Sequence, residues 1–336
     1  MKRDRLRFLF RLFISMVTVI WFCSAVQWAE LKTHLAQVHR PLLVIAILCH
    51  VPWVIPSAWR WKIIAGICGF PMSFRKSLRF CLIGIFFNTF LPTGNGGDVV
   101  RGLMASRDGG YPLGSMYATI LVERMIGIGV TLCLVLIGSI VFLSGTAVPR
   151  AVLDSSALLL VCILAAGFLL VSRPFRALVR RTLEAASLSR FHLGARDAAR
   201  VFDTCRRNPV RMAEAGMLTF VNQFIQIASA YLLCLAIPGC NATPGVLSVV
   251  IPLSFVAVLL PSIGGYGVRE AGMVIFFGWF GISREPAAAF SILRLPFLWI
   301  SALTGGIIYL VFNTPPGGID APSRVNRLLR KVLLIR

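Results

Sequence analysis

The stretch Asn88-Thr89-Phe90-Leu91-Pro92-Thr93-Gly94-Asn95-Gly96-Gly97-Asp98-Val99-Val100-Arg101 interrupts an apolar run with proline, glycines and charged residues. A similar stretch, Leu260-Pro261-Ser262-Ile263-Gly264-Gly265-Tyr266-Gly267-Val268-Arg269-Glu270, follows about half a chain later. Both read Leu-Pro-Ser/Thr, one or two residues, Gly-Gly, two residues, Val-Arg. Proline and glycine break helices and leave backbone polar groups unpaired, so at membrane depth such a segment must be buried in protein or line a wet cavity. Each copy is therefore a candidate site.

The composition indicates a polytopic integral membrane protein. The chain is 57% hydrophobic and 14% charged, with apolar runs longer than a soluble core needs, which predicts an all-α helix bundle. The net charge is +21, but the basic residues gather between the apolar runs and in the tail. The positive-inside rule and attraction to anionic lipids explain this charge without nucleic acid. The nine cysteines show no metal-ligand spacing, so we expect buried thiols and neither a metal nor another cofactor.

The apolar runs fall into two length classes. Ordinary crossings are predicted over residues 8–28, 41–61, 113–143, 151–171, 215–237 and 290–312, with a further helix over residues 271–282. The runs 80–91 and 246–260 are shorter, and each ends at one of the two glycine-rich motifs. Residues 80–91 would span only about 18 Å as a helix, against a hydrocarbon core of about 30 Å. The sequence therefore predicts two short, Gly/Pro-broken, re-entrant segments.

The distribution of basic residues predicts the orientation. The N-terminus is basic, and residues 173–211 contain ten arginines, the strongest cytoplasmic signal in the chain. We expect a transmembrane domain over residues 1–313 in the bacterial inner membrane, with both termini in the cytoplasm. A basic amphipathic pattern over residues 175–186 predicts a helix that lies on the inner leaflet or packs on the bundle. Residues 314–336 read as a basic amphipathic cytoplasmic tail.

The two motifs are predicted to enter from opposite faces. Three predicted crossings separate them, and an odd number reverses the side of entry. Opposite entry of the two motifs is the topology of an inverted repeat, with halves of about residues 1–172 and 173–313. In transporters of that kind, paired broken helices meet near the midplane and form the binding site.

The charged side chains in or beside the apolar runs are the candidate functional residues. Each costs roughly 2.5 to 3.5 kcal/mol at the bilayer centre, so it must face the bundle interior, a wet cavity or a partner. The cations outnumber the anions, four to three: Arg101, Arg124, Arg269 and Arg294 against Asp98, Glu123 and Glu270. The surplus leaves room for an anionic group, and arginine suits bidentate phosphate recognition. The alternative is that these residues pair only among themselves to hold the helices together.

The glycine pairs of the motifs and the polar residues within the apolar runs can each have a binding role or a packing role. Gly96-Gly97 and Gly264-Gly265 could give amide donors to a phosphate, or serve only for tight helix packing. No Gly-Lys-Ser/Thr follows, so a nucleotide-binding P-loop is excluded. The polar residues within apolar runs either line a path or make interhelical hydrogen bonds: Asn88, Asn222, Gln223 and Gln226.

Taken together, the motifs resemble the lysylphosphatidylglycerol synthase transmembrane region, a flippase-like family. The resemblance runs over about residues 8–312 and rests on Asn88, Leu91-Pro92, Gly96-Gly97-Asp98, Arg101, Glu123-Arg124, Pro261, Gly264-Gly265, Gly267 and Arg269-Glu270. It implies an inner-membrane bundle that moves lipids or lipid-linked molecules between leaflets. Two-part members also carry a soluble aminoacyl-transfer domain, and because this sequence stops at Arg336 we expect no synthase activity from it.

We therefore predict a lipid flippase, not an enzyme, that moves an anionic phospholipid or polyprenyl-phosphate head group. The predicted substrate-binding residues are Asn88, Pro92, Gly96, Gly97, Asp98, Arg101, Glu123, Arg124, Pro261, Gly264, Gly265, Arg269, Glu270 and Arg294. One alternative is an accessory subunit that positions a partner synthase in a pathway for hopanoids or aminoacyl-phospholipids. Another is a membrane enzyme with Asp98 or Glu123 as general base.

Overall fold

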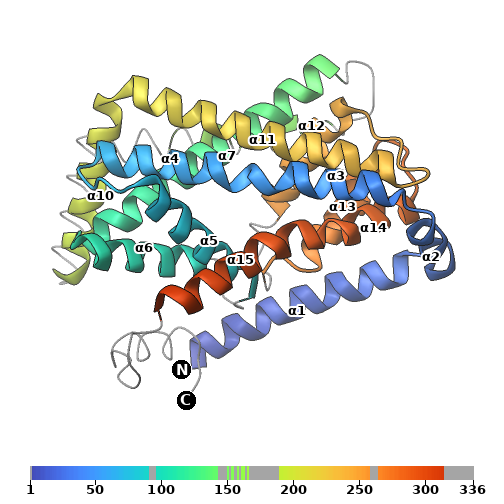
Figure 1. Ribbon diagram of the computed structural model, residues 1–336, viewed down its shortest axis with the longest axis horizontal. Coiled ribbons are helices and arrows are strands. Elements are labelled where there is room, and N and C mark those ends of the chain that lie inside the picture. The colour runs from blue at the N-terminus through green and yellow to red at the C-terminus, as the bar shows by residue number, and fades with distance from the viewer. Residues whose placement is uncertain are drawn as a thin grey trace.

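Helices form every regular element in the part of the chain that the computed structural model describes, as the sequence predicted (Figure 1). That part comprises residues 2–90, 96–142, 189–257 and 264–313, with a few helical residues between 150 and 165. Pro92, Pro261, the predicted helix 175–186 and the tail 314–336 lie outside the described residues.

Four described stretches are long and apolar enough to cross a membrane. The first, Arg40–Ile67, consists of α3 (Arg40–His50), a short 3-10 turn (Val51–Trp53) and α4 (Val54–Ile67). The others lie in α7 (Leu113–Phe142), in α11 (Pro209–Ala236), and in α14 (Arg284–Leu293) followed by α15 (Leu295–Asn313). Long apolar helices are thus confirmed at the predicted crossings 41–61, 113–143, 215–237 and 290–312. The last one is longer than predicted, because it begins at Arg284.

The first predicted crossing is bent. α1 (Lys2–Ala25) ends before Trp28, where α2 (Trp28–Ala36) begins, and the two axes differ by 82°. Between them Gln27 has an extended backbone, which ends the first helix. The chain returns through α3, whose first turn follows His39.

The first motif joins two helices of a tight hairpin. α5 (Phe74–Phe90) begins at Phe74 instead of the predicted Phe80, and α6 (Gly96–Gly109) leads away from the motif. At 17 residues α5 is about 26 Å long, still short of a full hydrocarbon core. A Cβ on Gly97 would collide with the backbone carbonyl of Gly84, so glycine is what lets the two helices touch.

The second motif joins α12 (Pro244–Ala257) to α13 (Val268–Gly278). In Figure 1, α5 and α6 occupy the half of the bundle that also holds α10 (Ser189–Arg207), whereas α12, α13 and α14 occupy the half that holds α2. The two hairpins therefore enter from opposite ends. The described ends of the two hairpins meet, since a Cβ on Gly264 would lie 2.9 Å from the carbonyl oxygen of Thr89 at the end of α5. This is the arrangement that an inverted-topology repeat requires; the repeat itself stays a prediction.

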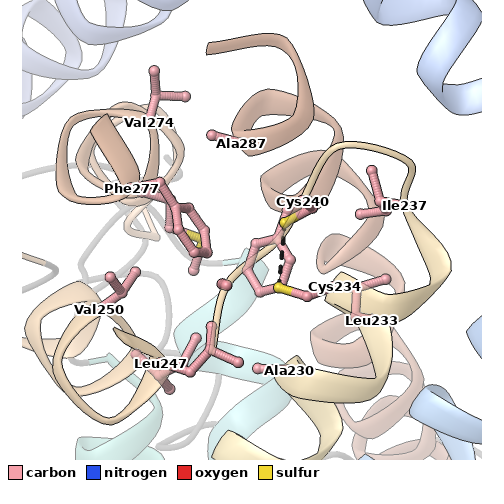
Figure 2. Close-up of a cluster of buried hydrophobic side chains, with 14 of the residues drawn as sticks. Ala230, Leu233, Cys234, Ile237, Cys240, Leu247, Val250, Val274, Phe277 and Ala287 are labelled. Carbon is pink, nitrogen blue, oxygen red and sulfur yellow. Dashed lines mark hydrogen bonds between the residues drawn. The ribbon is translucent and has the colours of Figure 1, made fainter. Parts of the chain in front are cut away.

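The largest apolar core surrounds the second hairpin (Figure 2). Phe277 of α13 and Phe290 of α14 are fully buried and meet edge to face, with ring centroids 5.0 Å apart. Leu233 of α11 and Leu247 of α12 are also fully buried there. Aromatic and aliphatic side chains interlocked in this way hold the helices in fixed positions.

One predicted loop is a helix. Residues 189–207 of the arginine-rich segment form α10, which buries Val201, Phe202 and Cys205 against α4 and α7. The apolar face of this helix is therefore covered by protein. The sequence did not predict it, because the many arginines on its other face dominated the pattern.

Candidate functional site

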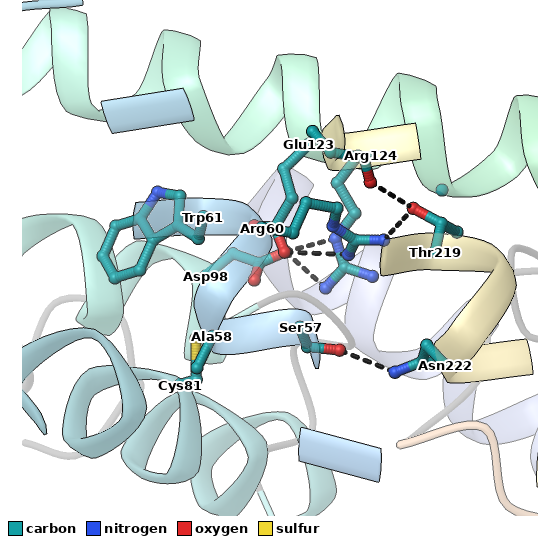
Figure 3. Close-up of polar contacts among 12 residues, drawn as sticks. Ser57, Ala58, Arg60, Trp61, Cys81, Asp98, Glu123, Arg124, Thr219 and Asn222 are labelled. Carbon is teal, nitrogen blue, oxygen red and sulfur yellow. Dashed lines mark hydrogen bonds and ion pairs between the residues drawn. The ribbon is translucent and has the colours of Figure 1, made fainter. Parts of the chain in front are cut away.

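Five charged side chains of α4, α6 and α7 are joined by ion pairs in an order of alternating sign. Figure 3 labels four of them, Arg60, Asp98, Glu123 and Arg124. We call these five side chains the ionic chain. Its order is Arg60, Glu123, Arg101, Asp98 and Arg124. The first motif contributes Asp98 and Arg101 from the first turns of α6, and α7 contributes Glu123 and Arg124.

Glu123 is the centre of the buried part of the chain. Its Oε1 accepts a hydrogen bond of 2.8 Å from Nη2 of Arg60, and its Oε2 pairs with Nη2 of Arg101 at 2.8 Å. The Arg60 guanidinium also donates to Oγ1 of Thr219 on α11, at 2.8 Å. The side chains of Glu123 and Arg101 are 5% and 7% exposed. One carboxylate thus ties three helices together, away from solvent.

Asp98 is the second link and leads toward the surface. Its Oδ1 lies 3.2 Å from Nη2 of Arg101, and its Oδ2 lies 2.6 Å from Nη2 and 2.9 Å from Nε of Arg124. Arg124 is 52% exposed, so the ionic chain is buried at one end and open at the other. Half of the Arg124 side chain is therefore left uncovered by the described helices.

Arg101 is held on several sides. Its guanidinium lies over the Trp61 ring, 4.6 Å from the centroid, and its Nη1 donates to the Cys81 sulfur at 3.5 Å. The indole of Trp61 donates in turn to Thr119 at 3.2 Å. Such cation–π contact adds stabilisation in a desolvated site. The cation of the first motif is therefore fixed in position before any ligand arrives.

The ionic chain carries a surplus positive charge, because it contains three arginines and two carboxylates. Desolvation of ions is costly, and buried pairs are stable only when each charge has an oppositely charged neighbour. Each carboxylate here serves two arginines. An arriving anion would therefore meet a site with positive charge to spare.

Other residues of the first motif shape the hairpin. Oδ1 of Asn88 accepts a hydrogen bond of 2.8 Å from the backbone N–H of Gly97, which anchors the start of α6 to α5. That amide is therefore occupied by Asn88. Gly96 and Gly97 are buried, and Gly97 makes the close approach to α5 described above. For Gly97 the packing interpretation of the glycines agrees with the contacts.

The second motif forms a glycine turn. Gly264, Gly265 and Gly267 have φ of +61°, +81° and +81°, values at which residues with a Cβ are strained. The Glu270 carboxylate accepts a hydrogen bond of 2.7 Å from the Gly267 backbone N–H and so caps α13. Glu270 was predicted as a substrate-binding residue, with pairing to an arginine as the alternative. Among the described residues it makes no ion pair, because its carboxylate is turned back on its own helix.

Arg294 and Arg269 stand apart from the ionic chain. Arg294 lies at the junction of α14 and α15, where its Nη2 donates to Oε1 of Gln226 at 3.4 Å. Its Nη1 is enclosed by protein and has no hydrogen-bond partner. Within the described ranges neither arginine has a carboxylate at ion-pair distance, and the charge that acts on Arg294 from the second motif is another cation, Arg269.

The structure thus separates the predicted site residues into two groups. Asp98, Arg101, Glu123 and Arg124 come together as predicted, with Arg60 added. Arg60 was not among the predicted site residues, because the basic residues that follow it, such as Lys62 and Arg75, favour a cytoplasmic connection. Its position in a Trp-Arg-Trp sequence at the end of an apolar run is the one signal that could have placed it inside.

Comparison with known proteins supports a membrane family. Residues 8–305 match the family model described as the lysylphosphatidylglycerol synthase TM region. A UPF0104 membrane protein of Pyrococcus horikoshii is 24% identical over 308 residues, which cover 84% of this chain and 91% of that protein. No solved structure matches the chain.

Proposed function

We propose that this chain, which belongs to the lysylphosphatidylglycerol synthase transmembrane-region family, moves an anionic lipid head group between the leaflets of the membrane. The observation that carries the proposal is the ionic chain. It places a surplus arginine charge inside a membrane bundle, on a hairpin whose described end meets a second hairpin from the opposite end.

The chemistry of the ionic chain favours a phosphate-bearing lipid. A guanidinium binds phosphate through two parallel N–H donors, whereas a zwitterionic head group adds a cation that the surplus charge would repel. The name of the matching family supports phosphatidylglycerol as the first lipid to test. A polyprenyl phosphate has the same anionic group and is the second.

Head-group binding would act through exchange of ion-pair partners. In the structure Asp98 serves both Arg101 and Arg124. A phosphate that took Arg124 would leave Asp98 to Arg101 alone, and the hairpin formed by α5 and α6 would change its contacts with α7. A ligand shifts a conformational equilibrium only by its differential affinity for the two states, and this exchange supplies such a difference. The protein would work as a transporter of the inner membrane, with the α10 end in the cytoplasm.

A leaflet-translocation assay tests the proposal. Purified protein is reconstituted in vesicles with fluorescent phosphatidylglycerol, fluorescent phosphatidylcholine or a polyprenyl-phosphate analogue, and the outer-leaflet fraction is followed with a membrane-impermeant quencher. The Arg101→Gln variant retains the pairs Arg60–Glu123 and Arg124–Asp98, so it should fold. We expect it to slow phosphatidylglycerol movement at least about tenfold, because it removes the surplus positive charge and the pairing of Asp98 with Arg101 on which the exchange depends.

Arg107→Gln is the matched control, because Arg107 is an exposed arginine in the last turn of the same helix. It should move lipid at the wild-type rate. Equal rates for Arg101→Gln and wild type, or no movement of any lipid by folded wild-type protein, would refute the proposal. The second result would favour the accessory role beside a partner lipid synthase.

A further inference from the structure

Arg294 is a cation without a counterion in the described part of a membrane-spanning stretch. It lies within Arg284–Phe312, and the one hydrogen bond of its side chain goes to a neutral amide oxygen at 3.4 Å. The Phe290 ring, with its centroid 5.9 Å away, is the other described group that faces the guanidinium. The enclosed Nη1 is left without a partner, although a guanidinium removed from water loses several kcal/mol of hydration. In the ionic chain, by contrast, every arginine has a carboxylate. Among the described residues, no carboxylate therefore balances the charge of Arg294.

The described groups around Arg294 hold its guanidinium in position but do not balance its charge. Arg269 of the second motif brings a second positive charge within electrostatic range. Glu270, the nearest carboxylate in sequence, is committed to the Gly267 amide. The side-chain amide of Gln226 is fixed by a hydrogen bond of 2.8 Å from its Nε2 to Oδ1 of Asn222. This hydrogen bond turns Oε1 of Gln226 toward Arg294 and holds the guanidinium in place.

A buried polar stripe on α11 connects this place to the ionic chain. The stripe consists of Thr219, Asn222, Gln223, Gln226 and Ser229, which are all buried. Thr219 contacts Arg60 at one end, and Gln226 contacts Arg294 farther along. Gln226 follows Thr219 by seven positions, which corresponds to a rise of about 10 Å along the helix axis. The two groups of arginines thus lie roughly 10 Å apart along one helix face, each in contact with that face.

We propose that the Arg294 guanidinium, held in position by Gln226, forms a second anion site, separate from the ionic chain, which takes a phosphate group and is linked to the first site by the polar stripe of α11. A lipid phosphate and free inorganic phosphate share the chemistry that this guanidinium recognises. The inference deepens the proposed function, since a head group that leaves Arg101 or Arg124 would reach Arg294 next.

The test measures anion binding instead of transport. Wild-type protein and Arg294→Gln are placed in nanodiscs of phosphatidylcholine, and the midpoint of thermal unfolding is followed as phosphatidylglycerol replaces phosphatidylcholine. In a second arm, inorganic phosphate is added to pure phosphatidylcholine nanodiscs. A ligand that binds the folded state raises the midpoint with its concentration. We expect Arg294→Gln to require about tenfold more anion for the same rise.

Two further variants make the result decisive. Arg284→Gln removes an exposed arginine at the start of the same stretch and should respond as wild type does. Arg294→Lys keeps the charge but loses the two-pronged donor, and should fall between wild type and Arg294→Gln. An Arg294-dependent response to phosphatidylglycerol alone assigns the site to a lipid head group, and a response to inorganic phosphate alone assigns it to the free anion. Equal responses of wild type, Arg294→Gln and Arg294→Lys in both arms would overturn the inference.

The translocation assay separates the two proposals. Protein that binds anion through Arg294 but moves no lipid would contradict the proposed function and leave the second site standing. If phosphatidylglycerol movement depends on Arg101 but anion binding does not depend on Arg294, the proposed function is supported and the second anion site is contradicted.

Discussion

Replacement of Glu123 by glutamine should destabilise the protein far more than replacement of Arg101 by glutamine. Glu123→Gln leaves three arginines and one carboxylate in the ionic chain, whereas Arg101→Gln leaves two separate neutral pairs. The first change therefore creates uncompensated buried charge, and the second removes the surplus. The two side chains are almost equally buried, so a difference cannot come from burial alone.

The structure fixes the magnitude. Glu123 makes ionic contacts of 2.8 Å with each of two arginines, in surroundings where it is 5% exposed. Removal of one member of a buried ion pair typically costs about 3 to 5 kcal/mol, because the remaining charge loses its compensation. We expect that loss for Glu123→Gln. For Arg101→Gln we expect about 1 to 2 kcal/mol, since both carboxylates retain a partner and only the contacts with Trp61 and Cys81 are lost.

Unfolding by a denaturing detergent in mixed micelles gives both free energies under one set of conditions. The double variant Arg101→Gln with Glu123→Gln is the useful third protein, because it leaves two arginines and one carboxylate, whereas Glu123→Gln alone leaves three arginines and one carboxylate. Its loss should be smaller than the sum of the two single losses. If Glu123→Gln unfolds within about 1 kcal/mol of wild type, the reasoning from charge balance is refuted.

Three glycine substitutions test the packing of the hairpins by the same unfolding measurement. Gly97→Ala puts a Cβ into the carbonyl of Gly84 and should cost about 2 kcal/mol or more, as overpacking does; wild-type stability would show that α5 and α6 are not in contact. Gly264→Ala meets the Thr89 carbonyl at 2.9 Å with φ of +61°, and should cost roughly 1 to 2 kcal/mol; no loss would contradict the meeting of the two hairpin ends. Gly216→Ala has open space around the new Cβ within α11 and should stabilise by up to about 1 kcal/mol; a loss there would place another helix against Gly216.

The long apolar runs could be predicted from the sequence because hydropathy and helix length depend on local composition. The ends of these helices were less predictable. The last long apolar stretch begins at Arg284 instead of Phe290. Its first turns contain Ala287, Ala288 and Ala289, which are fully buried against other helices. Alanine contributes little to a hydropathy average, so the sequence did not indicate that this segment belongs to the helix. α10 was missed for a related reason, since its buried face is short and its arginines are many.

The candidate site could be predicted in part. Charges inside apolar runs are rare enough that Asp98, Arg101, Glu123 and Arg124 stood out, and the structure brings them together. Partner choice could not be predicted, because it depends on which helix faces which. Arg60 joins from a helix end, while Glu270 leaves the expected group to cap its own helix.

Opposite entry of the two hairpins is the central claim, and cysteine labelling from each membrane face tests it most directly. Arg107→Cys marks the exposed end of the first hairpin and Asn241→Cys the exposed approach to the second. Each is introduced into protein whose native cysteines are replaced, and a membrane-impermeant maleimide is applied to sealed vesicles of each orientation. We predict that the two cysteines react from opposite faces, with the one at 107 on the face that carries α10. Reaction of both cysteines from the same face would contradict the claim.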